Sequence, residues 1–116
     1  MARLTDPDRL AAYLDALGNW VVEGCIYFKI PERAARFLRK LGIKERELKQ
    51  LMYEYVTAGG EIDEVREVYE EYKEHEFHHD LRFRINDKPI YIETRLIYRP
   101  PFEPLNPEIM VVNVHE

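Results

Sequence analysis

Apolar and polar residues alternate along the stretch from Phe77 to Tyr98, with one interruption at Asn86-Asp87. Alternation with a period of two is typical of a half-buried strand, and asparagine and aspartate tolerate the positive φ angles of a tight turn. The stretch therefore predicts a β-hairpin that turns at Asn86-Asp87. A two-residue turn separates an apolar face from a polar face. The apolar face holds Leu81, Phe83, Ile85, Ile90, Ile92 and Leu96, and the polar face holds His78, Asp80, Arg82, Tyr91, Glu93 and Arg95.

Apolar residues at helical spacing mark four further segments. The first begins at Thr5-Asp6-Pro7-Asp8, where Thr5 can cap the helix, and it ends at Gly18. The second runs from Pro31 to Gly42, and the third follows Ile43 and breaks at Gly59-Gly60. The fourth continues through residues 61–76, whose glutamates, Glu67 among them, predict a charged and solvated outer face.

Three more stretches complete the expected fold. Residues 20–28 are rich in β-prone side chains and predict a short strand or a two-strand ribbon. Residues 99–107 contain four prolines, which predicts an ordered excursion or a flexible flap. The β-branched stretch 109–116 predicts an interior or near-interior strand; if Met110, Val112 and Val114 face the core, Asn113 and His115 share the polar side of the hairpin. The sequence thus predicts one α+β domain over residues 1–116, with N-terminal helices packed on a small antiparallel sheet of about three to four strands.

The charge of the chain is unevenly distributed. The formal net charge is −5, which argues against broad affinity for nucleic acid. Residues 61–76 carry eight acidic and two basic side chains, whereas residues 33–49 carry seven basic ones. The acidic and basic segments could complement each other within the fold, or they could steer a partner.

Cys25 is the only cysteine, so no disulfide can form within the chain. No apolar run approaches the length of a membrane span, and the first residues lack the apolar core of a signal peptide. We therefore expect a cytoplasmic protein that has no membrane partner. Cys25 itself is expected to be a small buried hydrophobe.

No motif with a stringent spacing is present, so the polar face of the hairpin is the candidate place for chemistry. Asp80 stands opposite Glu93, and like charges across a ladder are destabilising unless a cation lies between them. Arg82 and Arg95 are the diagonal neighbours of this pair. One interpretation is an exposed lattice of ion pairs that contributes little stability. The other is a cluster suited to phosphodiester cleavage, in which arginines stabilise phosphate charge and a histidine or glutamate moves a proton.

The four histidines are His75, His78, His79 and His115. Neutral imidazoles beside Asp80 or a terminal glutamate could bind a divalent ion. Adjacent residues on a strand point to opposite faces, however, so His78 and His79 cannot easily share an ion. The sequence therefore predicts neither a metal site nor a cofactor.

Several short strings resemble bacterial toxins of the RelE/MqsR type, which are small ribonucleases of the barnase–colicin–RelE fold, and a related group of small uncharacterised domains. The strings are Val21-Val22-Glu23-Gly24-Cys25-Ile26, the helix end Leu41-Gly42-Ile43, His79-Asp80-Leu81 where these toxins show Gln-Asp-Val, Ile90-Tyr91-Ile92 in place of Val-Tyr-Leu, and Val112-Asn113-Val114-His115-Glu116 in place of a closing Ser-Phe-Lys-Glu strand. The resemblance extends over most of the chain, but each string is short.

The resemblance implies a metal-independent endoribonuclease of a toxin–antitoxin pair. His79 falls where the family has an active-site glutamine, Tyr91 on its catalytic tyrosine, and His115 on its terminal lysine. His79 or His115 would then handle protons, and Tyr91 would orient the ribose hydroxyl or the phosphate. The residues expected to contact the substrate are Arg82, Arg95, Glu93 and His78. The implied partners are RNA and either a cognate antitoxin or another protein; the oligomeric state stays open.

Two alternatives compete with the ribonuclease. The first is a non-catalytic protein-interaction domain of the same fold, which docks through a sheet edge or through the acidic segment. The second is an accessory or regulatory protein with a small-molecule pocket under the proline-rich loop.

Overall fold

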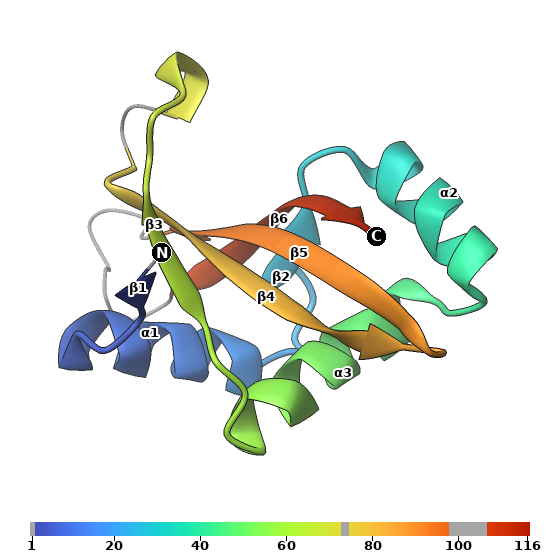
Figure 1. The fold of residues 1–116 in the computed structure, drawn as a ribbon, viewed down its shortest axis with the longest axis horizontal. Helices are drawn as coiled ribbons and strands as arrows, with labels where there is room; N and C mark the ends of the chain where they lie inside the picture. Colours follow the sequence, from blue (N-terminus) through green and yellow to red (C-terminus); the bar gives the residue numbers. More distant parts are fainter. Residues whose placement is uncertain (1, 73–74, 98–106) are drawn as a thin grey trace.

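The computed structural model describes residues 2–72, 75–97 and 107–116. In this part of the chain three helices pack on a six-stranded sheet of order β1-β3-β4-β5-β6-β2, in which only the β2–β6 pair is parallel (Figure 1). The helices are α1 (Pro7–Gly18), α2 (Pro31–Leu41) and α3 (Glu45–Thr57). The strands are β1 (Ala2–Arg3), β2 (Ile26–Phe28), β3 (Asp63–Arg66), β4 (Phe77–Ile85), β5 (Lys88–Ile97) and β6 (Glu108–His115), and a 3-10 turn, η1, spans Glu70–Tyr72.

The expected α+β class is confirmed, but the expected size of the sheet is wrong. The sheet has six strands rather than three or four, because β2 and β3 join its ladder and the two-residue strand β1 extends it along β3. These three strands have two to four residues each, too few for a period of two to stand out in the sequence. The proline-rich stretch 99–106 lies outside the described residues.

The hairpin of β4 and β5 agrees with the sequence prediction in turn and register. Asn86 and Asp87 have φ angles of 51° and 65°, as a two-residue turn requires. Arg82 pairs with Tyr91, and the rest of the ladder follows the same register. The apolar and polar sets of side chains therefore lie on opposite faces of the sheet, as predicted.

The helix expected over residues 61–76 does not form in residues 61–72 and 75–76, the part of this segment that the structure describes. Residues 63–66 instead make strand β3, which pairs with residues 77–80 of β4, and only the 3-10 turn η1 follows. Ile62 and Tyr72 are buried, but Val68 and Tyr69 are exposed, so only part of the expected apolar stripe faces inward. Hydrogen bonds to β4 outweigh the weak helical pattern, since tertiary context readily overrides local propensity. In the ribbon expected at 20–28, residues 20–25 likewise form turns and a bend, and only residues 26–28 form a strand, β2.

A β-bulge changes which residues of β6 face the core. Glu93 pairs with Asn113, but the next residue of β5, Thr94, pairs with Val111, so Val112 is the extra residue. Val111 is thereby brought to the core side, where Val114 also lies opposite Ile92. Of the expected core set, Val114 faces the core and Val112, the extra residue of the bulge, is buried, whereas Met110 pairs with Arg95 on the polar side. Asn113 and His115 lie on the polar side, as expected.

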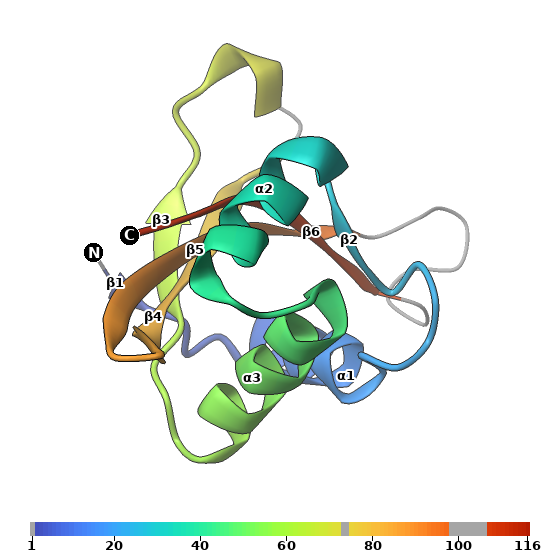
Figure 2. The same cartoon turned by 90° about the vertical axis from the view of Figure 1, so that its right-hand side faces the viewer.

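The helices cover one side of the sheet, which Figure 2 shows from the end where α2 lies. The core between the two layers holds Leu17, Ile26, Leu38, Leu48, Met52, Leu81, Ile90, Ile92 and Ile109, all nearly inaccessible to solvent. The polar face of β4, β5 and β6 is turned away from this core. None of the described helices has the length and the apolar run that crossing a membrane requires.

Ile92→Ala is expected to lower the free energy of unfolding by about 2–5 kcal/mol, because it opens a cavity in a packed core. Ile92 is 0% exposed and pairs with Leu81 on the core face. Arg39→Ala, at an exposed position of α2, is the control and should change stability by about 0.5 kcal/mol or less. Equal urea midpoints for the two variants would contradict the assignment of the core face.

Candidate functional site on the polar face of the sheet

Three side chains form a row across β4, β5 and β6 on the polar face. Arg82 pairs with Tyr91, and Tyr91 pairs with His115. The Arg82 guanidinium lies over the Tyr91 ring at 4.9 Å from its centroid, and the His115 ring centroid lies 4.8 Å from the same ring. The structure therefore brings together a cation, a phenol and an imidazole, three of the groups that the sequence singled out.

A buried carboxylate holds the phenol of this row in place. Asp80 is 1% exposed and accepts a 2.7 Å hydrogen bond from the Tyr91 hydroxyl at one oxygen. Its other oxygen lies 2.8 Å from Nδ1 of His78. Burial and the bond to Asp80 raise the pKa of Tyr91 well above its usual value. The Tyr91 hydroxyl therefore stays protonated and points in a fixed direction.

Arg95 lies on the same face but is closed off from solvent. It is 0% exposed, and its Nη1 lies 2.8 Å from Oε2 of Glu93. Its Nη2 lies 2.8 Å from Oε2 of Glu67. The two atoms form an ion pair, but their geometry does not meet the angles of a hydrogen bond. The ring of Tyr72, from η1, covers the Arg95 guanidinium at 4.4 Å. Arg95 therefore neutralises two glutamates, and as placed it cannot reach a substrate phosphate.

The like charges of Asp80 and Glu93, which face each other across the ladder, are compensated separately. Glu93 pairs with Arg95 on its own strand, whereas Asp80 is held by Tyr91 and His78. Neither carboxylate pairs with the arginine that lies diagonally across the ladder from it. Arg82 instead forms a 3.0 Å ion pair with Asp63 of β3. Among the residues that the structure describes, no three His, Cys, Asp or Glu side chains are arranged to hold a metal ion.

His79 lies on the opposite face, among the helices, and is not brought beside Tyr91. Its Nε2 is 3.0 Å from Oε2 of Glu64, which also accepts two hydrogen bonds of 2.8 Å from Arg9. The only bulge recorded in the ladders of β4 and β5 falls between Glu93 and Thr94, so β4 keeps its alternation and His79 keeps its face. A role for His79 at the same site as Tyr91 is therefore incompatible with this geometry.

The surroundings of His79 favour its neutral form. A carboxylate only accepts hydrogen bonds, so the ring carries its proton on Nε2, and Nδ1 is buried without a partner in the described part of the chain. Burial lowers the pKa of His79, and Glu64 opposes this effect only in part. The hydrogen bond from Arg9 in turn lowers the pKa of Glu64.

Lowering the pH below about 6.5, the pKa of an unfolded histidine, is expected to reduce stability. The folded pKa of His79 is depressed, so the unfolded chain binds this proton first and stability falls until the folded pKa is reached. The Glu64 contribution is lost only at lower pH, as the pH falls through its own depressed pKa. His79→Gln, which keeps a donor toward Glu64, should remove the first of these two losses. Urea midpoints measured across the acid range test this, with His75→Gln as control; an unchanged pH dependence in His79→Gln would contradict it.

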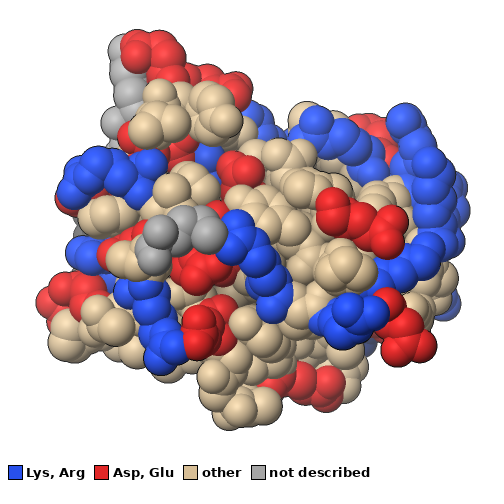
Figure 3. All heavy atoms as spheres, in the orientation of Figure 1, with Lys and Arg blue, Asp and Glu red and all other residues tan. Residues whose placement is uncertain are grey.

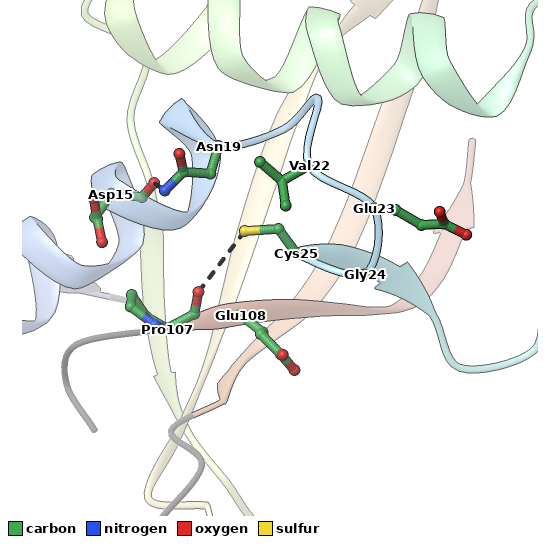
Figure 4. Close-up of a pocket in the computed structure, with 8 residues that line it drawn as sticks. All are labelled: Asp15, Asn19, Val22, Glu23, Gly24, Cys25, Pro107 and Glu108. Atoms are coloured by element: carbon green, nitrogen blue, oxygen red, sulfur yellow. Dashed lines mark hydrogen bonds between the residues drawn. The ribbon is translucent and has the colours of Figure 1, made fainter. Parts of the chain in front are cut away.

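A separate hollow of about 370 Å³ surrounds Cys25 between the end of α1 and the start of β6 (Figure 4). The Cys25 thiol contacts the carbonyl oxygen of Ala16 at 3.3 Å and that of Pro107 at 3.8 Å. Burial raises the pKa of this thiol, so it stays protonated and unreactive. Its position confirms that Cys25 acts as a small buried hydrophobe.

Sequence reasoning missed Glu67 and Tyr72 as parts of the polar face. Both belong to the segment that was expected to be a helix with a solvated outer face, yet the Glu67 side chain is 1% exposed against Arg95. Tyr72 lies between Arg95 and Lys29, whose Nζ is 4.1 Å from the centre of its ring. The sequence did show a surplus of carboxylates over cations in residues 61–76. That surplus indicates that some of these carboxylates pair elsewhere, but it does not indicate that Glu67 pairs with Arg95.

Comparison with protein-family models, with curated proteins and with solved structures found no match for this chain.

Proposed function

We propose that the protein is a metal-independent endoribonuclease whose site is the row of Arg82, Tyr91 and His115. The observation that carries the proposal is the convergence of these three groups: the guanidinium and the imidazole flank one tyrosine ring at 4.9 and 4.8 Å. A cation, a fixed hydroxyl and a titratable imidazole are the groups that cleavage through the 2′-hydroxyl of RNA requires.

In the proposed reaction the 2′-oxygen of a ribose attacks the adjacent phosphorus. The His115 imidazole accepts the proton of that hydroxyl, and Arg82 faces the negative charge that develops on the phosphate oxygens. The bond from phosphorus to the 5′-oxygen breaks, and the leaving oxygen takes a proton from water. The products are a 2′,3′-cyclic phosphate and a free 5′-hydroxyl.

Tyr91 and the residues behind it act by positioning. Asp80 accepts the Tyr91 proton in a hydrogen bond, so the lone pairs of the phenol oxygen stay directed to the open side. His78 holds Asp80, and Arg95 neutralises Glu93 and Glu67, which lowers the repulsion that an RNA phosphate meets at this face. Arg82 must leave or share its contact with Asp63 to bind phosphate.

The test is incubation of the purified protein with mixed RNA, with and without EDTA, followed by mapping of the product ends. We expect cleavage in EDTA, cyclic phosphate ends, and a steep loss of activity with added salt, because few cations hold the RNA. Absence of cleavage under all of these conditions would overturn the proposal.

A second candidate is a non-catalytic interaction domain that binds a protein, such as a cognate antitoxin. The observation that favours it is that Arg82 and Arg95 are both paired with carboxylates within the chain, which leaves less positive charge for phosphate. This candidate predicts no RNA cleavage and no cyclic phosphate ends in the same assay.

A further inference from the structure

The described cations differ in whether they form an ion pair with a carboxylate. Five arginines on and around the sheet pair with carboxylates: Arg3 with Glu61, Arg9 with Glu64, Arg66 with Glu76, Arg82 with Asp63, and Arg95 with Glu67 and Glu93. Arg36, Arg39 and Lys40 on α2 are exposed, and within the described residues none of them forms an ion pair. Lys44, Arg46, Lys49, Arg84 and Lys88 also form no ion pair within the described residues, but α2 places three such cations within five positions of one helix.

The sequence of α2 sets this arrangement. Leu38 and Leu41 are buried, and Ala34 and Phe37 are partly buried, so one side of the helix packs on the protein. Arg33, Arg36, Arg39 and Lys40 project from the remaining surface. Figure 3 shows Lys and Arg side chains gathered on the right-hand side of the molecule, where Figure 1 places α2.

The position of α2 connects this surface with the proposed site. Arg33 donates a 3.1 Å hydrogen bond to the carbonyl oxygen of Val112, which fixes the start of α2 against β6. The contact places α2 against β6, the strand that ends in His115, and Figure 2 shows β6 passing α2 on its way to the C-terminus. The row of Arg82, Tyr91 and His115 lies on the face of the sheet that is turned away from the helices, so a chain of phosphates reaches α2 from the row by passing round the end of β6.

We infer that the exposed cations of α2 bind the phosphate backbone of the RNA beyond the proposed cleavage site. The inference rests on the proposed function for its ligand, and it assigns to α2 a contact that does not depend on RNA sequence. From Arg33 to Lys40 the helix extends about 10 Å. In duplex DNA each strand carries about one phosphate per 3.4 Å of helix axis, so a surface of this length can face more than one phosphate.

The surface explains how an acidic protein can hold RNA. Lysine and arginine that neutralise phosphates release counterions, and this supplies the affinity that is independent of sequence. Cations already paired with carboxylates gain little from a phosphate, because they exchange one anion for another. The unpaired cations of α2 carry no such cost.

The experiment compares two triple variants that each remove three positive charges. The test variant is Arg36→Gln with Arg39→Gln and Lys40→Gln on α2. The control is Arg3→Gln with Arg66→Gln and Lys88→Gln, all exposed and none of them on α2. Both variants have the same net charge, so only the place of the lost charge differs.

The measurement is fluorescence anisotropy of a short labelled single-stranded RNA, with 2′-O-methyl groups throughout, at several salt concentrations. This RNA cannot be cleaved through its 2′-oxygen, so the result is independent of catalysis. The test variant should bind more weakly than wild type and should reduce the salt slope of log K by about 2, at about 0.7 per lost contact in a single strand. The control variant should keep the wild-type slope.

Equal dissociation constants and slopes for the two triple variants would overturn the inference, as would a wild-type protein that does not bind this RNA. A self-association, seen by light scattering, that only the test variant abolishes while RNA binding is unchanged would assign α2 to a second copy of the chain and also overturn it. Binding through α2 without cleavage of ordinary RNA would support the inference and reject the proposed function. Cleavage with no difference between the two variants would do the reverse.

Discussion

Arg95→Ala is expected to lower the free energy of unfolding by about 3–5 kcal/mol, the usual cost of removing one partner of a buried ion pair. Arg95 is 0% exposed and is the cation that faces both Glu67 and Glu93. Without it, two carboxylates lie close together with no positive charge between them, and one of them, Glu67, is almost completely buried. A loss of this size is a large part of the stability of a typical domain.

The matched control is Arg66→Ala. Arg66 also pairs with a glutamate, Glu76, but both side chains are more than half exposed. An exposed pair of this kind contributes about 0–1 kcal/mol. Urea unfolding of both variants gives the comparison directly, and a similar small loss for Arg95→Ala and Arg66→Ala would show that Arg95 is solvated rather than buried.

A double variant separates the charge from the packing. Arg95→Met with Glu67→Leu replaces the ion pair by apolar groups of similar length, and such replacements are often neutral or stabilising. We expect the double variant to be more stable than Arg95→Ala. If it is less stable, the polar contacts of Arg95 with Glu93 and with the backbone carbonyl of Thr94 contribute more than the pair with Glu67.

The hairpin was predictable because several independent signals in the sequence agree. Strict alternation on both sides of Asn86-Asp87 permits only one even register, and both turn residues tolerate the positive φ that the structure shows. The same alternation placed Tyr91 and Arg82 on one face of the sheet and His79 on the other. The resemblance to toxin strings set His79 beside Tyr91, and there the alternation of the strand was the better guide.

The rest of the sheet was not predictable from local pattern. Ile62 and Val65 lie three residues apart, which is the spacing of one helix face. The same spacing occurs in the extended chain seen here, where Ile62 is buried and Val65 is partly buried. The bulge at Val112 lies in a run of β-branched residues, where every position suits a strand and no residue marks the extra one. The pair of Glu67 and Arg95 joins residues far apart in the sequence, so no local pattern indicates it.

The candidate site shows the same division. Arg82, Tyr91 and His115 were chosen as chemically suited residues, and the hairpin register together with the last strand was enough to align them. Their environment depends on tertiary contacts. Arg82 and Arg95 look alike in the alternating pattern, but η1 covers only Arg95, which separates a buried structural cation from a partly exposed one.

His115→Ala is expected to lower the rate of RNA cleavage about 100-fold or more, as for loss of a proton-transfer group. His115 is the only histidine in the row, and it lies at the exposed end of β6. Its ring contacts Tyr91 but fills no core position, so the variant should keep the wild-type free energy of unfolding within about 0.5 kcal/mol. The measurement is the initial rate of cleavage in EDTA, with folding checked by urea unfolding.

His75→Ala is the matched control, since His75 lies in the segment after η1 and outside the row, and it should retain the wild-type rate. Tyr91→Phe is a less clean variant, because it also removes a hydrogen bond to the buried Asp80 and should cost about 1–3 kcal/mol of stability. Its rate is therefore interpreted only at a temperature where the variant is fully folded, and there it should fall below wild type. If His115→Ala and His75→Ala cleave equally fast while both are folded, the imidazole of His115 moves no proton, and the row across β4, β5 and β6 is not the catalytic site.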